Sequence, residues 1–255
     1  MAVPGAVHDL ARIHGEHTRY EVDNTPIEAY VARPQEEGRY PGVIVIHEAF
    51  GPVEHIRDVA RRFANQGYIA IAPNLYSRVG SPDLTQMNTV WEKMFSLPDH
   101  QIVRDLEGAA EYLRQSTFCT GKVGIIGFCS GGRQTLLTAC QSESVDAAVD
   151  CWGGFITSAS PDEKTTAARP TPIVDMAGSL HCPLLVVIGE EDTNPSPEEG
   201  GLLAEKLAEA DQPYEVKVYH GAGHAFFADY RPNYREEAAF RLWDDVTEFF
   251  QQHLQ

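Results

Sequence analysis

Short apolar runs alternate with amphipathic segments, and this pattern constrains the fold of the chain more than any other feature. Runs such as VIVI and LLVVI contain no polar residue. A strand with one face in water alternates polar and apolar side chains, so these runs fit strands buried on both faces of a parallel sheet. The expected strands are residues 43–46, 68–72, 123–126, 145–149, 184–188 and 215–219, and the expected helices are residues 54–66, 99–115, 131–141, 199–211 and 234–253. In the last helix Phe240, Trp243 and Phe250 recur at helical spacing and are expected in the core. The alternation predicts an α/β domain with a mainly parallel central sheet flanked by helices.

A turn signal precedes this pattern near the N-terminus. Residues 19–33 contain two β-prone runs on either side of the Asp-Asn-Thr sequence at 23–25, which is typical of an antiparallel hairpin. The chain has 255 residues, a length at which one domain can bury a large core. We therefore expect an N-terminal extension at residues 1–18 and a single domain at residues 19–255.

Two stretches fit no regular unit. Residues 77–97 and residues 155–180 each follow the end of an expected strand. Ligands of open α/β sheets bind beyond the carboxyl ends of the strands, so both stretches could form the roof of a site. Ordinary surface excursions with a few core contacts explain them equally well.

Composition excludes several classes of protein. Lys and Arg total 20 against 37 Asp and Glu, a formal net charge of −17. Nucleic acids and anionic membrane surfaces attract basic proteins, so we expect neither as a partner. The chain has no apolar run long enough for a bilayer span, and residues 1–17 contain no continuous apolar stretch of the kind found in secretory signals. We therefore expect a cytoplasmic protein, either a monomer or a small homo-oligomer.

The five cysteines form no metal or redox motif. Their number is odd, and no CxxC pair occurs. We expect no metal site, and we expect four of the cysteines to be reduced and buried in the core. These four are Cys119, Cys140, Cys151 and Cys182.

The fifth cysteine, Cys129, lies in the most informative motif. The segment GFCSGG, residues 127–132, joins an expected strand to an expected helix and matches a Gly-x-nucleophile-x-Gly elbow. The small residues at this spacing allow the strand and the helix to approach each other, and the helix N-terminus favours an anion. We interpret Cys129 as a nucleophile and the N–H of Ser130 as an oxyanion donor. A glycine-rich turn around an inert cysteine is the alternative.

An acid and a histidine follow in the order that elbow enzymes use. Asp192 follows the expected strand 184–188, and Glu190 and Glu191 are alternatives within two residues. His224 lies on a short glycine-containing loop before the last expected helix, whereas His220 lies at a strand end. We expect His224 to activate the thiol and later water, and Asp192 to hold its tautomer.

The segment HEAFG, residues 47–51, follows the first buried strand. In elbow hydrolases this loop supplies the second oxyanion N–H, which here would come from Ala49. An ionised Glu48 beside the nucleophile would oppose a thiolate, unless the carboxylate moves or pairs with a cation.

Together these motifs resemble those of the dienelactone hydrolase family, which has the α/β-hydrolase fold. The resemblance covers about residues 20–250 and rests on five segments. These are HEAFG (47–51), LYSR (75–78), GFCSGG (127–132), GEED (189–192) and GHAF (223–226). It implies cofactor-free hydrolysis of an enol lactone through a thioester.

The resemblance also implies roles for individual residues. Cys129, Asp192 and His224 correspond to the catalytic triad, and the N–H groups of Ala49 and Ser130 to the oxyanion hole. Glu48 corresponds to a glutamate that holds the resting thiol and swings to an arginine when substrate binds. Two substrate-binding positions follow from the same comparison, namely Arg78 for that arginine and Trp152 for an aromatic pocket residue.

The chain departs from the family pattern after the histidine. A serine and an arginine that grip the substrate carboxylate are replaced by Ala225 and Ala228. Arg231 lies further on and could substitute for them, although we expect a surface arginine. Without these ligands a neutral ester or lactone becomes more plausible as the substrate.

Thiolate chemistry limits the substrate further. A thiolate is itself a good leaving group, so the acyl substrate needs a stabilised leaving group such as an enolate or a phenolate. The sequence therefore predicts a hydrolase of small activated esters or lactones. A broad carboxylesterase of neutral esters and a non-catalytic small-molecule receptor on the same fold are the alternatives.

Overall fold

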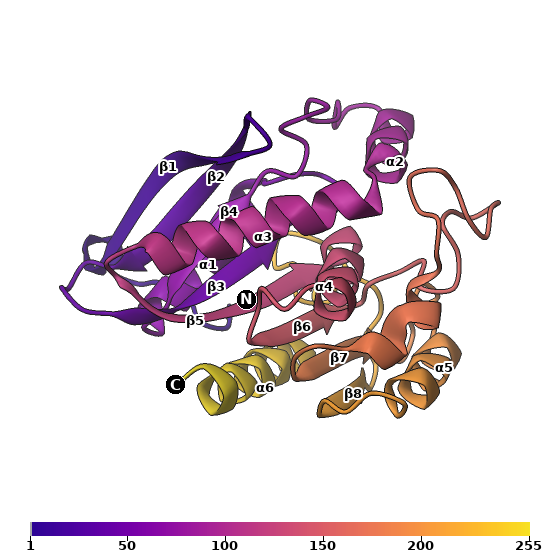
Figure 1. Cartoon of the computed structure of the whole chain (residues 1–255). Coiled ribbons are helices and arrows are strands. Elements are labelled where there is room, and N and C mark those ends of the chain that lie inside the picture. The colour runs from indigo at the N-terminus through magenta and orange to yellow at the C-terminus, as the bar shows by residue number, and fades with distance from the viewer. Residues whose placement is uncertain (1) are drawn as a thin grey trace.

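A single sheet of eight strands lies at the centre of the computed structural model, which describes residues 2–255 (Figure 1). The strand order is β1-β2-β4-β3-β5-β6-β7-β8. Strands β3 to β8 run parallel, while β1 and β2 are antiparallel to their neighbours. The strands are β1 (Ile13–Val22), β2 (Thr25–Pro34), β3 (Tyr40–Ile46), β4 (Ile69–Pro73), β5 (Cys119–Phe128), β6 (Ala147–Cys151), β7 (Leu184–Gly189) and β8 (Tyr214–Tyr219). This arrangement confirms the predicted α/β class.

Helices cover both faces of the sheet (Figure 1). They are α1 (Glu54–Asn65), α2 (Met87–Ser96), α3 (Asp99–Gln115), α4 (Ser130–Gln141), α5 (Pro197–Leu207) and α6 (Glu236–Leu254), with short 3₁₀ segments η1 (Leu10–Arg12) and η2 (Ile173–Ser179). Successive residues of β3 point to opposite faces: Ile44 packs with α3 and α4, and Val43 packs with α1 and α6. Both faces are therefore buried, which explains the uninterrupted apolar runs.

The predicted hairpin is present and longer than expected. Ile13 pairs with Pro34 and Val22 with Thr25, so β1 begins before residue 19. Asp23 and Asn24 form the turn with φ of 51° and 58°, the left-handed conformation that a two-residue hairpin turn requires. The segment before β1 also contacts the domain, because the Tyr234 hydroxyl donates to the carbonyl of Ala2 at 2.7 Å.

Two details correct the sequence prediction. The stretch 77–97 was expected to contain no regular element, but it contains α2, of which only Val90 and Met94 are buried. The apolar residues 87, 90, 91, 94 and 95 recur at helical spacing, and this pattern was the available signal for the helix. Phe240 was expected in the core, yet it is 38% exposed on the outer side of α6.

The segments 77–97 and 155–180 lie at the same end of the molecule (Figure 1). Arg169 of the second segment donates to the carbonyl of Met94 in α2 at 2.6 Å, which joins them. No helix in residues 2–255 is both long enough and apolar enough to cross a bilayer.

Candidate active site

Cys129 lies at a strained turn between β5 and α4. Its φ of 55° and ψ of −117° are unusual for a residue with a side chain. A Cβ on Gly127 would lie 2.0 Å from the carbonyl oxygen of Gly131, and one on Gly131 would lie 2.6 Å from that of Ile46. The glycine spacing of the motif is thus a packing requirement, because β5, α4 and the end of β3 approach without side chains between them.

His224 and Asp192 come from the loops after β8 and β7. Nδ1 of His224 lies 2.8 Å from Oδ2 of Asp192, whose side chain is only 2% exposed. The other carboxylate oxygen accepts from the Asn194 N–H at 3.0 Å. The pKa of His224 is raised to about 10: burial acts to lower it, but hydrogen bonds with Asp192 and Cys129 and the charges of both groups outweigh burial. His224 is therefore an imidazolium at neutral pH in this arrangement.

A cavity of about 220 Å³ joins these residues. Cys129, Ser130, Asp192 and His224 all line it, and parts of the segments 77–97 and 155–180 complete the lining. The other lining residues are Trp91, Met94, Arg133, Gly154, Phe155, Arg169, Thr193 and Asn194. Of the two interpretations of these segments, the roof is the one that the geometry favours.

The loop after β3 is held from several sides. The buried His47 ring places Nδ1 2.6 Å from the carbonyl oxygen of Glu48, and its Nε2 accepts from the Leu75 N–H at 3.2 Å. Burial lowers the pKa of His47 to about 4, so the ring is neutral and donates through Nδ1. The Tyr76 hydroxyl donates to the carbonyl of Ala49 at 2.8 Å. These contacts fix the backbone around Ala49, the predicted oxyanion residue, and no sequence motif indicates them.

Glu48 forms an ion pair with Arg231. The Arg231 guanidinium donates to Oε2 of Glu48 at 2.9 Å, and the Tyr230 hydroxyl lies 3.2 Å from the same oxygen. The Glu48 side chain is 4% exposed, and that of Arg231 is 23% exposed and stacks on Phe50. Arg231 is thus partly buried rather than the surface arginine that we expected.

The two predicted substrate-binding residues lie outside the lining of this cavity. The Arg78 guanidinium donates to Asp105 at 2.8 Å and to the carbonyl of Val22 at 2.9 Å. Trp152 follows β6 with φ of 46°, is 1% exposed, and packs against Phe226 with ring centroids 4.7 Å apart. Neither Arg78 nor Trp152 lines the cavity that contains Cys129.

Two arginines of the cavity, Arg133 and Arg169, were not among the residues predicted for the site. Arg133 lies on α4, one turn after Cys129, directly behind the GFCSGG segment. Its position on the elbow helix was the available signal. Arg169 lies in the irregular segment 155–180, where no periodic pattern indicates which side chains point inward.

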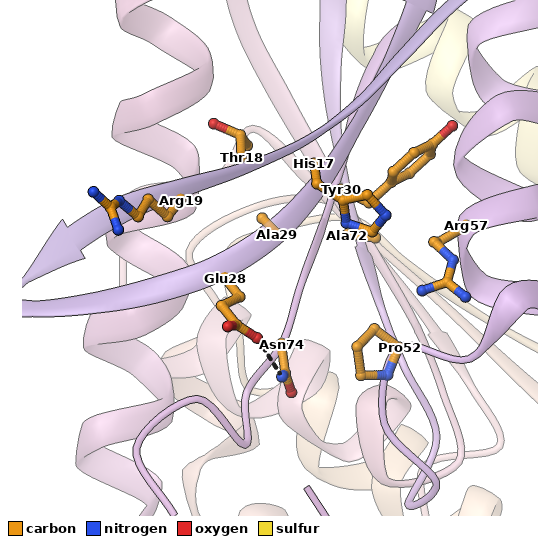
Figure 2. A pocket seen from close by; sticks show the side chains of 10 residues that line it. All are labelled: His17, Thr18, Arg19, Glu28, Ala29, Tyr30, Pro52, Arg57, Ala72 and Asn74. Atoms are coloured by element: carbon orange, nitrogen blue, oxygen red, sulfur yellow. Dashed lines mark hydrogen bonds between the residues drawn. The ribbon is translucent and has the colours of Figure 1, made fainter. Parts of the chain in front are cut away.

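A second hollow, of about 600 Å³, lies beside the antiparallel end of the sheet (Figure 2). Residues of β1, β2 and α1 line it, among them His17, Tyr30 and Arg57. Glu28 accepts from the Asn74 amide there at 3.4 Å. The lining residues include neither Cys129 nor His224, so this hollow is separate from the candidate active site.

The strand–turn–helix elbow, the histidine–aspartate pair and the mainly parallel sheet define an α/β-hydrolase with a cysteine at the elbow. The model of the dienelactone hydrolase family matches residues 27–254, and the chain belongs to this family. A Yersinia pestis protein named "Putative carboxymethylenebutenolidase" is 38% identical over 97% of this chain and 92% of its own length. A Bradyrhizobium protein named "Probable 2-oxo-3-(5-oxofuran-2-ylidene)propanoate lactonase" is 30% identical over 89% of each chain.

A solved structure agrees with this assignment. The crystal structure titled "Putative Dienelactone Hydrolase" from Klebsiella pneumoniae has a TM-score of 0.86 and 34% identity, and the match covers 94% of this chain and 99% of that one. A promiscuous phosphotriesterase from metagenomic libraries, with 22% identity and a TM-score of 0.79, shares the fold. The family and its relatives indicate a hydrolase that acts on ester or lactone bonds.

Proposed function

We propose that the chain hydrolyses activated esters or lactones without a cofactor, with Cys129 as the nucleophile and a thioester as the intermediate. The observation that carries this proposal is the constellation of Cys129, His224 and Asp192 around one cavity. Each comes from a separate loop at the carboxyl end of the sheet, where α/β enzymes bind their ligands.

Acylation uses the Cys129 thiolate. The sulfur attacks the carbonyl carbon, and the N–H groups of Ser130 and Ala49 stabilise the oxyanion that forms. The carbon–oxygen bond to the leaving group then breaks, and the leaving oxygen takes a proton from the His224 imidazolium. Asp192 keeps the proton on Nδ1, so the proton that moves is on Nε2.

In deacylation His224 acts first as a base and the Cys129 sulfur is the leaving group. Neutral His224 takes a proton from a water molecule, and the hydroxide oxygen attacks the thioester carbon. The carbon–sulfur bond breaks, the free acid leaves, and the thiolate and the imidazolium are restored. One water molecule is consumed in each turnover.

The substrate requirement follows from the first step. The tetrahedral intermediate expels its better leaving group, and a thiolate leaves more readily than an alkoxide. Productive turnover therefore needs an enolate or a phenolate as the leaving group. The lactone in the name of the Bradyrhizobium relative agrees with this substrate class.

Glu48 would control the resting state. Its carboxylate accepts a hydrogen bond from Arg231 in the structure. We propose that this is the swung position of the glutamate, and that Arg231 takes the part that the resemblance assigned to Arg78. With Glu48 neutralised by Arg231, its charge no longer opposes the Cys129 thiolate.

The test compares hydrolysis of a dienelactone and of a neutral aryl ester by the wild type and by Cys129→Ala. We expect kcat to fall by about 10⁴-fold or more for every substrate that the wild type cleaves, because the covalent step is lost. Cys119→Ala is the matched control, since Cys119 is a free, buried cysteine at the far end of β5. Undiminished turnover by Cys129→Ala would show that Cys129 is not the nucleophile.

A further inference from the structure

A groove continues from the Cys129 cavity between α2 and the segment 155–180. Its volume is about 690 Å³, and it shares Trp91 and Phe155 with the lining of the cavity, which measures about 220 Å³. Sites for small molecules usually measure about 300–1,000 Å³. The cavity alone lies below this range, whereas the cavity together with the groove lies within it.

Three aromatic rings give the groove an apolar surface. The ring centroids of Trp91 and Phe95 lie 6.5 Å apart, and Phe95 meets Phe155 edge-on at 5.2 Å. Trp91 is nevertheless 44% exposed. The other apolar lining residues are Pro161 and the alanines at 159, 167 and 168. Exposed aromatic surface beside a candidate nucleophile is typical of a ligand site.

Phe155 is held at the junction of the cavity and the groove. Its φ is 56°, a left-handed conformation that a residue with a side chain rarely adopts. Its N–H donates to Oδ1 of Asn194 at 2.9 Å, and the Asn194 N–H donates in turn to Asp192 at 3.0 Å. The loop that carries the proposed catalytic acid therefore also fixes the aromatic residue between the two hollows. Backbone strain that the surrounding structure retains in this way is typical of functional sites.

The charges of the groove indicate which substituent it accepts. Its ionisable lining residues, among residues 2–255, are Asp162 and Glu163, and both are exposed. An anionic group in the groove would meet two like charges, whereas an uncharged hydrocarbon would be stabilised by burial against the aromatic rings. The groove therefore suits a neutral apolar group, in agreement with the neutral substrate expected from Ala225 and Ala228.

We propose that the groove binds an uncharged, apolar acyl chain of the substrate. This inference rests on the proposed function, because the chain belongs to an ester or lactone whose carbonyl carbon lies at Cys129. His224 protonates the leaving oxygen, and it lines the cavity but not the groove. The leaving group thus stays beside His224, while the acyl chain extends past Trp91 and Phe155. The substrate class is an activated ester or lactone with an apolar acyl chain.

The 4-nitrophenyl esters of acetic, butanoic and hexanoic acid test this assignment, because they share one leaving group. For the wild type we expect kcat/KM to rise about two- to fourfold for each added methylene, which corresponds to half to full burial of that methylene. Trp91→Ala removes one aromatic ring, and Ala167→Glu adds a carboxylate from the segment 155–180. We expect both variants to lose most of the rise and to change the value for the acetate ester much less.

Met87→Ala is the matched control. Met87 is 46% exposed on the same helix, one turn before Trp91, and it is not a lining residue of the groove, so this variant should keep the wild-type rise. The absence of a rise in the wild type, or equal losses on all three esters in Trp91→Ala and Ala167→Glu, would overturn the proposal. A lost rise that accompanies a change of mass in sedimentation would assign the groove to a second copy of the chain, and would overturn it as well.

Modification of Cys129 tests the groove without hydrolysis. Ethyl and hexyl methanethiosulfonate transfer their alkylthio groups to a thiolate and release the same methanesulfinate, so the alkyl chain is then attached to Sγ as the acyl chain is in a thioester. We expect the ratio of the hexyl rate to the ethyl rate, relative to glutathione, to fall about fivefold or more in Trp91→Ala and Ala167→Glu, with Cys129→Ala as the blank. An unchanged ratio would overturn the groove. If the wild type cleaves none of the three esters, the proposed function fails, while this ratio still decides the groove.

Discussion

The pKa of His224 lies far above the usual value for a histidine. Its pKa of about 10 reflects hydrogen bonds with Asp192 and Cys129 that outweigh its burial. The side chain is 34% exposed, yet Asp192 beneath it is almost fully buried. The imidazolium is thus held between the Asp192 carboxylate and Cys129.

This shift predicts how stability depends on pH. The folded pKa lies above the unfolded value of about 6.5, so the interaction stabilises the fold fully below about pH 6.5 and is lost as the pH rises through about 10. We expect the free energy of unfolding of the wild type to exceed that of His224→Gln at pH 6, and the difference to shrink toward pH 10. Urea denaturation at a series of pH values measures it.

His220 provides the control for this measurement. It pairs with Glu190 at 2.6 Å, but its side chain is 89% exposed. An exposed pair contributes little, so His220→Gln should not alter the pH profile. A constant difference between the wild type and His224→Gln across the range would contradict the assignment.

At the scale of elements, the elbow between β5 and α4 is a junction where the backbones approach too closely for side chains. Here β5 and α4 approach until a Cβ at Gly127 would overlap the backbone of Gly131. The strained φ of Cys129 is held by the hydrogen bond from its own N–H to the carbonyl of Cys151, at 3.0 Å, and by the packing around it. The sheet thus holds the candidate nucleophile in the lining of the cavity.

Two alanine substitutions test this junction. Gly127→Ala must separate β5 from α4, and we expect it to destabilise the fold by about 2–4 kcal/mol. Gly201→Ala, in the exposed part of α5, meets nothing within 4 Å and should stabilise by about 0.5–1 kcal/mol. Chemical denaturation measures both. An unaltered stability of Gly127→Ala would mean that the elbow can relax.

Elements with a strong local pattern could be predicted from the sequence. The helix Asp99–Gln115 has the predicted bounds, and the buried strands lie within a few residues of theirs. Helix α2 could have been predicted, because its apolar residues 87, 90, 91, 94 and 95 recur at helical spacing, although only Val90 and Met94 are buried. The segment 155–180 has no such pattern, and its shape depends on contacts such as that between Arg169 and α2.

For the whole molecule, the formal charge of −17 acts at long range and repels an approaching anion. Salt screens the long-range repulsion, because the Debye length falls from about 30 Å at 0.01 M to about 10 Å at 0.1 M, but it screens buried charges much less.

Ionic strength should therefore act on charged substrates alone. 4-Nitrophenyl hydrogen glutarate carries a carboxylate, and 4-nitrophenyl acetate is neutral. We expect kcat/KM for the glutarate ester to rise about two- to fivefold between 0.01 and 0.2 M NaCl, and the value for the acetate ester to stay constant. Steady-state kinetics at several salt concentrations measure this. A decrease for the glutarate ester would contradict a dominant long-range repulsion by the net negative charge.

The sequence by itself determined most of the strands and helices along the chain, the hairpin, the elbow around Cys129 and the loops of Asp192 and His224. These features depend on neighbouring residues, through side-chain periodicity, turn geometry and the small size of glycine. Only the tertiary structure decided that Glu48 pairs with Arg231, that Arg78 pairs with Asp105, and that Arg169 is buried beside the cavity. Such contacts join residues far apart in the chain, and the balance between burial and charge that selects them exists only once the elements have packed together.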